Sequence, residues 1–215
     1  MKINNNSSLL FIGDSITDCG RGFPVGRKNT LGSGYVNLID CLLNSVYPKL
    51  KVNILNTGIS GNTILDLEAR WQRDVIDLKS NWVSIMIGIN DVWQQVEVPN
   101  FFDNLNIENY EKIYRKLIES IINKVERIIL MTPYYIELNS HDPMRKMMDK
   151  YSAVVKKLSS EYNTVFVDTQ KYFDRYLDFN PSNTLSDDKV HPNLTGHMII
   201  ARSFVDAIGF EWKRF

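Results

Sequence analysis

The sequence predicts an α/β fold built on a parallel sheet that is covered by helices. Short apolar segments alternate along the chain with longer segments whose apolar residues recur at helical spacing. The apolar segments are almost unbroken, which is typical of parallel strands buried on both faces. Polar residues and glycines follow most of these segments directly. Because such sheets carry their sites at the carboxyl ends of the strands, these residues are the first candidates for a function.

Five strands are expected to alternate with five helices. The strands are expected at residues 9–12, 52–55, 82–89, 127–131 and 165–167. Helices are expected at residues 35–46, 64–78, 108–122 and 142–162, followed by one that carries Leu194, Met198, Ala201, Val205 and Ile208 on one stripe and stops at Gly209. The clearest helix is 108–122, whose buried face is Tyr110, Ile113, Tyr114, Leu117, Ile118 and Ile121.

Length and composition favour one domain over residues 1–215. The 215 residues are enough for one well-buried core, and no repeat or long linker divides them. Lys and Arg number 25 and Asp and Glu number 25, so no excess of basic charge favours nucleic acid or an anionic membrane. No apolar run approaches the roughly 18 residues of a membrane span. Polar residues 4–6 argue against a signal peptide, so a cytoplasmic location is expected.

The two cysteines do not suggest a disulfide framework. Cys19 and Cys41 are expected to be small buried residues in a reducing compartment, and the alternative is a reactive thiol.

The residues that follow the expected strands each allow a structural explanation when taken alone. Ser15, in Gly-Asp-Ser-Ile-Thr, could cap a helix, and Asn90, in Gly-Ile-Asn-Asp, suits a turn. Gly61 could simply permit a tight backbone. Asp188 and His191, before the last helix, could form a solvated pair.

Together, the same residues match the requirements of acyl transfer to water. That reaction needs a nucleophile, a base, a group that orients the base, and donors for the oxyanion. Ser15 supplies a hydroxyl, and His191 is the histidine with a carboxylate, Asp188, one turn before it. The N–H groups of Ser15 and Gly61 and the side-chain amide of Asn90 could surround the oxyanion.

Other chemistries are not expected from the motifs. Cysteine ligands and His-x-x-x-His spacing are missing, which argues against a metal site. A phosphate loop and the dinucleotide-binding glycine fingerprint are missing as well. Gly-x-Ser-x-Gly does not surround Ser15, which argues against the nucleophile elbow of α/β-hydrolases.

At these residues the sequence resembles the SGNH hydrolases, also called the GDSL esterase/lipase family. The four blocks of that family correspond to IGDSIT with Ser15, NTGISGNT with Gly61, GIND with Asn90, and DKVHPN with Asp188 and His191. They occur in family order between residues 12 and 193, and the one departure is Ile16 in place of leucine. The resemblance implies a flavodoxin-like three-layer α/β/α sandwich with strand order 2-1-3-4-5. It also implies ester hydrolysis through an acyl-serine, without a cofactor.

Longer stretches narrow the resemblance. LGSGYVNLIDCLL, the segment from GISGNTILDLEARW to SIMIGINDVW, and ILMTPYYIE resemble bacterial intracellular SGNH esterases that remove acetyl groups from xylo-oligosaccharides. This implies an acetylesterase whose partner is an oligosaccharide ester, and it suggests a homo-oligomer. Two alternatives stay open: a lipid or thioester acyl hydrolase, and a noncatalytic sugar-binding module.

Contacts with the substrate are expected close to these blocks. The candidates are Asp14, Arg21 and Arg27 in and after the first block, Trp93 just beyond the third, and Tyr134 and Tyr135 after the fourth strand. Aromatic faces with polar tips could stack on sugar rings. The alternatives are an ordinary core or a subunit contact for the aromatic residues, and a solvated loop for the arginines.

Overall fold

The computed structural model describes residues 3–27, 29–97 and 106–212. Within them, five strands form one sheet in the order β2-β1-β3-β4-β5. The strands are β1 (Ser8–Gly13), β2 (Asn53–Asn56), β3 (Trp82–Met86), β4 (Arg127–Met131) and β5 (Val165–Val167). Every neighbouring pair is parallel. The predicted α/β class and the strand order 2-1-3-4-5 are therefore confirmed.

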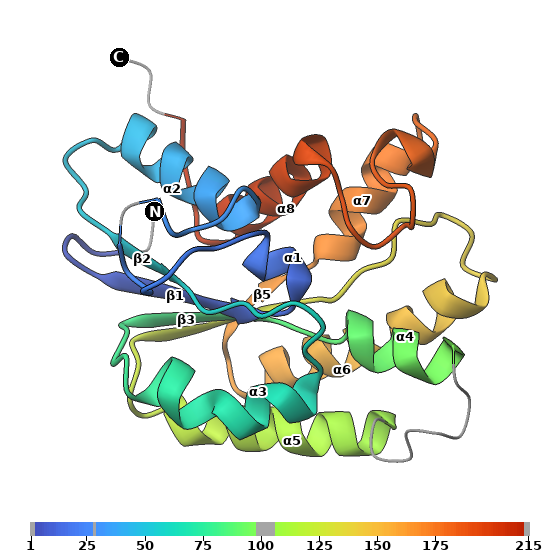
Figure 1. Ribbon diagram of the computed structural model, residues 1–215, viewed down its shortest axis with the longest axis horizontal. Helices are drawn as coiled ribbons and strands as arrows, with labels where there is room; N and C mark the ends of the chain where they lie inside the picture. Colours follow the sequence, from blue (N-terminus) through green and yellow to red (C-terminus); the bar gives the residue numbers. More distant parts are fainter. Residues whose placement is uncertain (1–2, 28, 98–105, 213–215) are drawn as a thin grey trace.

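Helices cover both faces of the sheet, so that the molecule has three layers (Figure 1). They are α1 (Ser15–Asp18), α2 (Tyr35–Val46), α3 (Ile64–Trp71), α4 (Ile89–Glu97), α5 (Ile107–Ile121), α6 (Pro143–Glu161), α7 (Thr169–Leu177) and α8 (Leu194–Ala207). In Figure 1, α2, α7 and α8 lie above the sheet, and α3, α5 and α6 lie below it. The chain passes through helices between successive strands, as parallel pairing requires.

The central strands are the most buried part of the core. Every side chain of 9–12 in β1 and of β3 is buried. Cover on both faces explains why both strands are continuous apolar runs in the sequence. The predicted face of α5 is confirmed, because all six of its expected residues are buried against the core.

Two expected elements differ from the observed bounds by more than one residue at an end. The third strand ends at Met86 rather than at residue 89, because Gly88 has a φ of 133° and Ile89 begins α4. The apolar run continues past the strand because Ile87 and Ile89 are buried as well. The expected helix 64–78 is α-helical only as far as Trp71 and continues as a π-helix, Gln72–Ile76.

The sequence does not predict α1, α4 or α7. α1 has only four residues, too few to show a period. The start of α4 is hidden in the apolar run that follows β3. In α7 the buried face includes two polar residues, Thr169 and Gln170, which weakens the helical pattern.

Most of the stripe expected on the last helix is buried. Ala201, Val205 and Ile208 are buried, whereas Leu194, the first residue of α8, is 63% exposed. Met198, also on the expected stripe, is half-buried. Gly209 follows the C-cap residue with a φ of 72°, as expected of a glycine that ends a helix.

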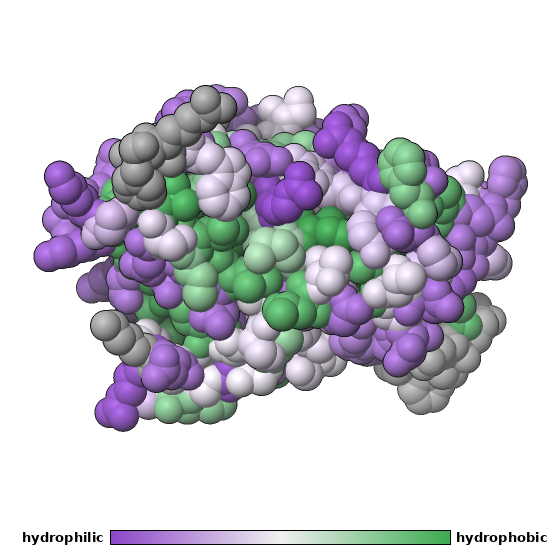
Figure 2. Space-filling model, turned by 90° about the horizontal axis from the view of Figure 1, so that it is seen from above, coloured by the Kyte–Doolittle hydropathy of each residue, from purple (hydrophilic) through white to green (hydrophobic). Residues whose placement is uncertain are grey.

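The cysteines are free, but the prediction that both are buried is wrong. Cys41 is exposed on α2, and Cys19 is half-buried. Figure 2 shows the face formed by α2, α7 and α8, where apolar residues gather across the middle and polar residues lie toward the edges. In the described ranges, no helix has the length and apolar character needed to cross a membrane.

We expect Gly13→Ala to lower the free energy of unfolding by about 1–3 kcal/mol, the usual cost of overpacking. A Cβ at residue 13 would lie 2.3 Å from the carbonyl oxygen of Met86 and 2.4 Å from the hydroxyl of Thr17, so β3 or α1 would have to move. Urea unfolding followed by circular dichroism measures the loss. Gly22→Ala is the matched control, because its Cβ would meet only Thr30, at 3.3 Å from the side chain and 3.6 Å from the backbone. Equal losses in the two variants would contradict this explanation.

Candidate active site

The exits of β1, β2 and β3 meet the segment before α8 around one hollow at the carboxyl edge of the sheet. Its volume is about 490 Å³. It is lined by Ser15, Ile16, Cys19, Ser60, Gly61, Asn90, His191, Pro192 and His197. The fold therefore brings together residues that the sequence supplies in four separate blocks.

Ser15 is held in place by the helix start that it occupies. It is the first residue of α1, and β1 ends only two residues earlier. The Asp14 carboxyl caps this helix by accepting a hydrogen bond from the Ile16 N–H at 3.0 Å. Ser15 Oγ lies 2.9 Å from Nε2 of His191. A capped turn thus sets the hydroxyl within hydrogen-bonding reach of a base.

His191 is in turn hydrogen-bonded to Asp188. Nδ1 of His191 lies 2.7 Å from Oδ2 of Asp188. Burial by itself would raise the pKa of Asp188, but hydrogen bonds from the His191 ring and from nearby backbone and hydroxyl groups hold that pKa well below its ordinary value. An ionised carboxylate only accepts, so Nδ1 of the neutral ring carries the proton and Nε2 can accept from the Ser15 hydroxyl. This is the arrangement of a serine nucleophile with an oriented base.

The turn from Asp188 to His191 is closed by its own hydrogen bonds. Oδ1 of Asp188 accepts from the Val190 N–H at 2.9 Å and the His191 N–H at 2.8 Å. The Ser186 hydroxyl donates to the same oxygen at 2.8 Å. Lys189, inside the turn, has a φ of 63°, in the left-handed region that non-glycine residues seldom adopt.

The loop after β4 holds this turn from outside. The Ile136 N–H donates to the Lys189 carbonyl at 2.8 Å, and the Tyr134 hydroxyl donates to the Val190 carbonyl at 3.2 Å. The Lys189 ammonium pairs with Glu137 at 2.5 Å. The position of His191 therefore depends on the residues that follow β4.

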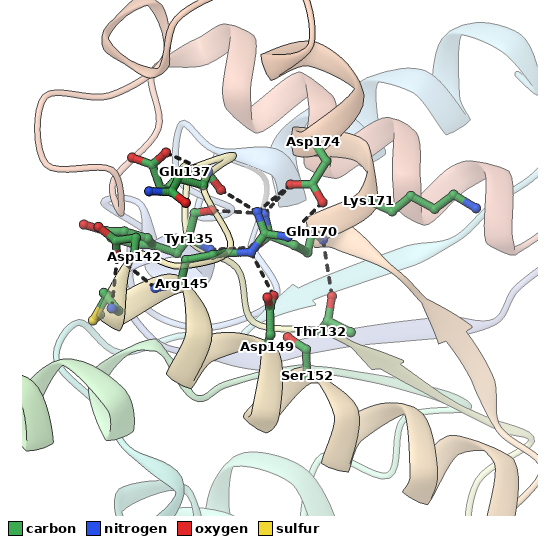
Figure 3. Close-up of polar contacts among 12 residues, drawn as sticks. Thr132, Tyr135, Glu137, Asp142, Arg145, Asp149, Ser152, Gln170, Lys171 and Asp174 are labelled. Atoms are coloured by element: carbon green, nitrogen blue, oxygen red, sulfur yellow. Dashed lines mark hydrogen bonds and ion pairs between the residues drawn. The ribbon is translucent and has the colours of Figure 1, made fainter.

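Arg145 and Gln170 fix that loop (Figure 3). The Arg145 guanidinium donates to both carboxylate oxygens of Asp174, at 2.8 and 2.9 Å, and to the backbone carbonyl of Glu137. The Gln170 amide accepts from the Tyr135 N–H at 2.8 Å and donates to the Tyr135 carbonyl at 3.0 Å. Helices α6 and α7 thus clamp the loop that supports His191.

The three predicted oxyanion donors belong to residues that line the hollow. The Ser15 N–H lies at a helix start, where no carbonyl of the same helix can accept from it. Gly61 has a φ of 82°, which glycine adopts without strain. The Asn90 amide donates one hydrogen bond to the Asn62 carbonyl at 2.9 Å, and an amide has a second N–H to offer. Together these donors suit an oxyanion beside Ser15 Oγ.

Two buried carboxyls flank the hollow. Asp14 precedes Ser15 and Asp91 follows Asn90, and the two are 1% and 0% exposed. Asp91 caps α3 from a distant part of the chain, because its carboxyl accepts from the Ile64 N–H at 3.0 Å. Burial raises the pKa of each carboxyl to about 7, although hydrogen bonds from backbone N–H groups oppose the rise. Both groups therefore exchange a proton near neutral pH.

The structure argues against substrate contacts by Asp14 and Tyr134. Tyr134 is 0% exposed, and its hydroxyl is used to hold the Val190 carbonyl. Asp14 is equally buried, and its carboxyl is used to cap α1. Both were expected to touch the substrate because they adjoin the conspicuous motifs, but they position Ser15 and the turn before His191 instead.

Trp93 and Tyr135 lie where a ligand could reach them. Trp93 is half-buried on α4, and its ring centre lies 6.1 Å from that of His191. Tyr135 is half-buried as well, and the Lys189 ammonium lies 5.9 Å from its ring centre. Both rings therefore lie close to the turn that carries the base.

Neither arginine of the loop after the first block lines the hollow. Arg21 donates to the Gly58 carbonyl, and its guanidinium lies 4.5 Å from the ring centre of Phe23. Arg27 is exposed and borders a separate hollow between α2 and β2. Arg21 thus supports the exit of β2, and no contact of Arg27 with the candidate site is observed.

Cys19 and His197 line the hollow without being expected there. Cys19 Sγ lies 3.4 Å from Nε2 of His197, and Nδ1 of His197 accepts from the Tyr35 N–H at 3.2 Å. Burial, with a smaller effect of His191, lowers the pKa of His197 to about 4. Cys19 is the C-cap residue of α1, and because the sequence does not predict so short a helix, it carried no signal for this placement. Among the described residues, no group of three or more His, Cys, Asp or Glu side chains could hold a metal ion.

We expect Asp14→Asn to gain stability relative to the wild type as the pH rises from about 4 to 7. The carboxyl ionises near 3.8 in the unfolded chain but only near 7 in the folded protein, so the folded state binds more protons in this range and rising pH disfavours folding. Asparagine keeps an oxygen for the Ile16 N–H and does not ionise. Urea unfolding of both proteins at several pH values measures the difference. Parallel curves for variant and wild type would contradict the assignment.

The comparisons with known proteins agree with this geometry. Residues 11–199 match the GDSL-like lipase/acylhydrolase family. The chain is 51% identical to an acetylxylan esterase of Geobacillus stearothermophilus, over 100% of this chain and 99% of that protein. The crystal structure of that esterase, Axe2, superposes with a TM-score of 0.97 over the same shares of the two chains, and solved structures of Axe2 include catalytic mutants that replace a serine, an aspartate or a histidine.

A second solved structure is similar over nearly the whole chain. LAE5, an α/β hydrolase enzyme from the metagenome of Lake Arreo in Spain, is 43% identical with a TM-score of 0.94, over 97% of this chain and 98% of that one. The fold, the site and these similarities lead to one assignment. The chain belongs to the GDSL-like lipase/acylhydrolase family.

Proposed function

We propose that this protein is a serine esterase that removes O-acetyl groups from carbohydrates such as xylo-oligosaccharides. The observation that carries the proposal is the hydrogen-bonded chain from Ser15 Oγ through His191 to Asp188. Gly61 and Asn90 line the same hollow and supply donors for an oxyanion. A nucleophile, an oriented base and an oxyanion hole together define acyl transfer.

In the first half of the reaction, Ser15 Oγ attacks the acetyl carbonyl carbon while Nε2 of His191 takes the hydroxyl proton. The carbonyl oxygen becomes an oxyanion, which accepts from the N–H groups of Ser15 and Gly61 and from the Asn90 amide. Asp188 stabilises the imidazolium without taking its proton. The bond to the sugar oxygen then breaks, His191 protonates that oxygen, and acetyl-Ser15 remains.

In the second half, water replaces the sugar. His191 takes a proton from the water, whose oxygen attacks the acetyl-serine carbonyl, and the same donors hold the second oxyanion. Collapse of this intermediate returns the proton from His191 to Ser15 Oγ and releases acetic acid, which loses its proton to the solvent as acetate. The half-exposed His191 ring, with 51% of its side chain accessible, lets water reach the base.

The carbohydrate acetyl substrate is supported by the full-length similarity to an acetylxylan esterase. Trp93 adds local support, because its ring lies beside His191, where a sugar leaving group has to pass, and aromatic faces stack on sugar rings. Two other functions remain alternatives. A lipid or thioester acyl hydrolase would use the same residues, and a noncatalytic sugar-binding module would leave Ser15 unreactive.

We also propose that the whole chain acts as one hydrolase domain, because residues from Ser15 to His197 line the same hollow. Two free cysteines support a reducing, cytoplasmic location. The apolar middle of the face formed by α2, α7 and α8 supports a homo-oligomer (Figure 2). Light scattering after size exclusion measures the mass of the assembly.

The substrate is tested with p-nitrophenyl esters from acetate to octanoate, together with acetylated xylo-oligosaccharides. We expect the highest kcat/KM for acetyl esters and release of acetate from the oligosaccharides, as the full-length similarity to an acetylxylan esterase suggests. Activity that rises with acyl chain length would favour the lipid or thioester hydrolase instead.

Ser15→Ala is expected to abolish turnover with the fold intact, because it removes the nucleophile alone. Asp188→Asn is expected to be less severe, since nucleophile and base remain while orientation is impaired. Steady-state rates and circular dichroism of the two variants give the comparison. Covalent labelling of Ser15 by an organofluorophosphate separates an enzyme from a binding module, because a folded protein that neither turns over nor labels would support the module.

A further inference from the structure

Arg70, on α3, is a buried cation whose donors converge on the segments of the candidate site. Its side chain is only 8% exposed. Nη2 donates to the Gly13 carbonyl at 2.9 Å, and Nη1 donates to the Thr57 carbonyl at 2.6 Å. Nε donates to Oδ1 of Asn62 at 2.6 Å. Asp74 balances the charge through an ion pair with Nη1 at 2.8 Å.

The acceptors lie next to the residues that supply the oxyanion donors. Gly13 ends β1, two residues before Ser15, and its carbonyl orientation is tied to the turn that sets the Ser15 N–H. Asn62 follows Gly61 directly in the chain. Thr57 lies at the exit of β2, on the segment that leads to Gly61. One guanidinium therefore bridges the two loops that carry backbone donors.

Asn62 extends this link to the third donor. Its side-chain oxygen accepts from Arg70, and its backbone carbonyl accepts from the Asn90 amide at 2.9 Å. A shift of Asn62 would therefore move the Asn90 amide as well as the Gly61 N–H. All three oxyanion donors lie on chain segments that the Arg70 guanidinium holds, directly or through Asn62.

If Arg70 only stabilised α3, its ion pair with Asp74 would be sufficient. Asp74 lies four residues after Arg70, and an i, i+4 ion pair of this kind stabilises a helix by itself. The three further hydrogen bonds reach out of the helix to both loops. Planar guanidinium donors in fixed directions suit this bridging, whereas the single ammonium of a lysine could not reach all of the acceptors.

We propose that Arg70 is a positioning residue that sets the geometry of the oxyanion hole. The inference rests on the proposed function, since it assigns Arg70 to the same acyl-transfer site. It predicts a loss in kcat rather than in KM, because the hole binds the oxyanion of the transition state more strongly than the carbonyl of the substrate.

The test is a double-mutant cycle of Arg70→Met and Asn90→Ala, measured with p-nitrophenyl acetate. Asn90→Ala is expected to lower kcat by about 100-fold, the scale of a lost oxyanion donor, and Arg70→Met by about 10- to 100-fold because it shifts donors without removing one, with KM within about threefold in both. Because both act on one hole, the double variant should retain at least about fivefold more activity than the product of the single losses predicts. Arg70→Lys should recover only part of the loss.

The inference would be overturned if the loss of kcat in the double variant equalled the product of the two single losses. An unchanged kcat in Arg70→Met would overturn it as well. Arg73→Met is the matched control, because Arg73 is 71% exposed, pairs with Asp74 and leaves the ion pair and the three bridging hydrogen bonds of Arg70 in place. It is expected to keep kcat within about threefold of the wild type. If Arg70→Met does not fold, Asn62→Ala provides the test, since it removes the Nε acceptor but keeps the carbonyl that Asn90 uses, and an unchanged kcat would again contradict the role.

A second readout separates this inference from the proposed function. Diethyl p-nitrophenyl phosphate releases p-nitrophenol once on phosphorylating Ser15, and its phosphoryl oxygen occupies the same hole. A wild type that reacts with this reagent but hydrolyses no acetyl ester contradicts the proposed substrate alone. Equal rates of phosphorylation in the wild type and folded Arg70→Met contradict the positioning role alone. A wild type that neither hydrolyses nor reacts contradicts both.

Discussion

The site depends on the close approach of α1 to the end of β1. Gly13 makes this approach possible, because a Cβ there would lie 2.4 Å from the hydroxyl of Thr17 in α1. The turn brings Ser15 to the carboxyl edge within two residues, where Asp14 can cap the new helix. The same helix start gives Ser15 an N–H without a partner in its own helix. The close packing at Gly13 therefore positions both the nucleophile and the first oxyanion donor.

Buried polar groups link this constraint to the other strand exits. A buried polar group needs a partner, and here the partners belong to the loops that build the site. Asp91 caps α3, and Arg70 from α3 binds the loops after β1 and β2. Asn56, at the end of β2, donates to the Thr17 carbonyl of α1 at 2.7 Å. The hydrogen bonds that satisfy these buried groups therefore also position the donors that line the hollow.

The sequence predicts the sheet well because continuous burial leaves a continuous apolar run, as in β1 and β3. It predicts the blocks of the hollow because Ser15, Gly61, Asn90, Asp188 and His191 are distinctive residues at strand exits. The sequence does not predict the role of a residue when that role depends on tertiary contacts. Buried Asp14 and Tyr134 look like surface contacts in a motif, and three of the four hydrogen bonds of Arg70 join segments whose proximity only the tertiary fold creates. The start of α4 was hidden for a related reason, since a buried helix turn and a strand are equally apolar.

The base is less enclosed than the groups that hold it. Side-chain exposures are 51% for His191 and 42% for Asp188, whereas Arg145, which clamps the loop that supports His191, has a side chain only 9% exposed. Water therefore has access to the imidazole until a substrate covers it, and hydrogen bonds in a drier site are electrostatically stronger. A leaving group broad enough to lie over His191 would remove that water, and the Trp93 ring beside it offers a flat surface for such a group. A sugar ring meets this requirement better than a small alcohol, so the openness of the base itself favours an acetylated carbohydrate over a simple acetate ester.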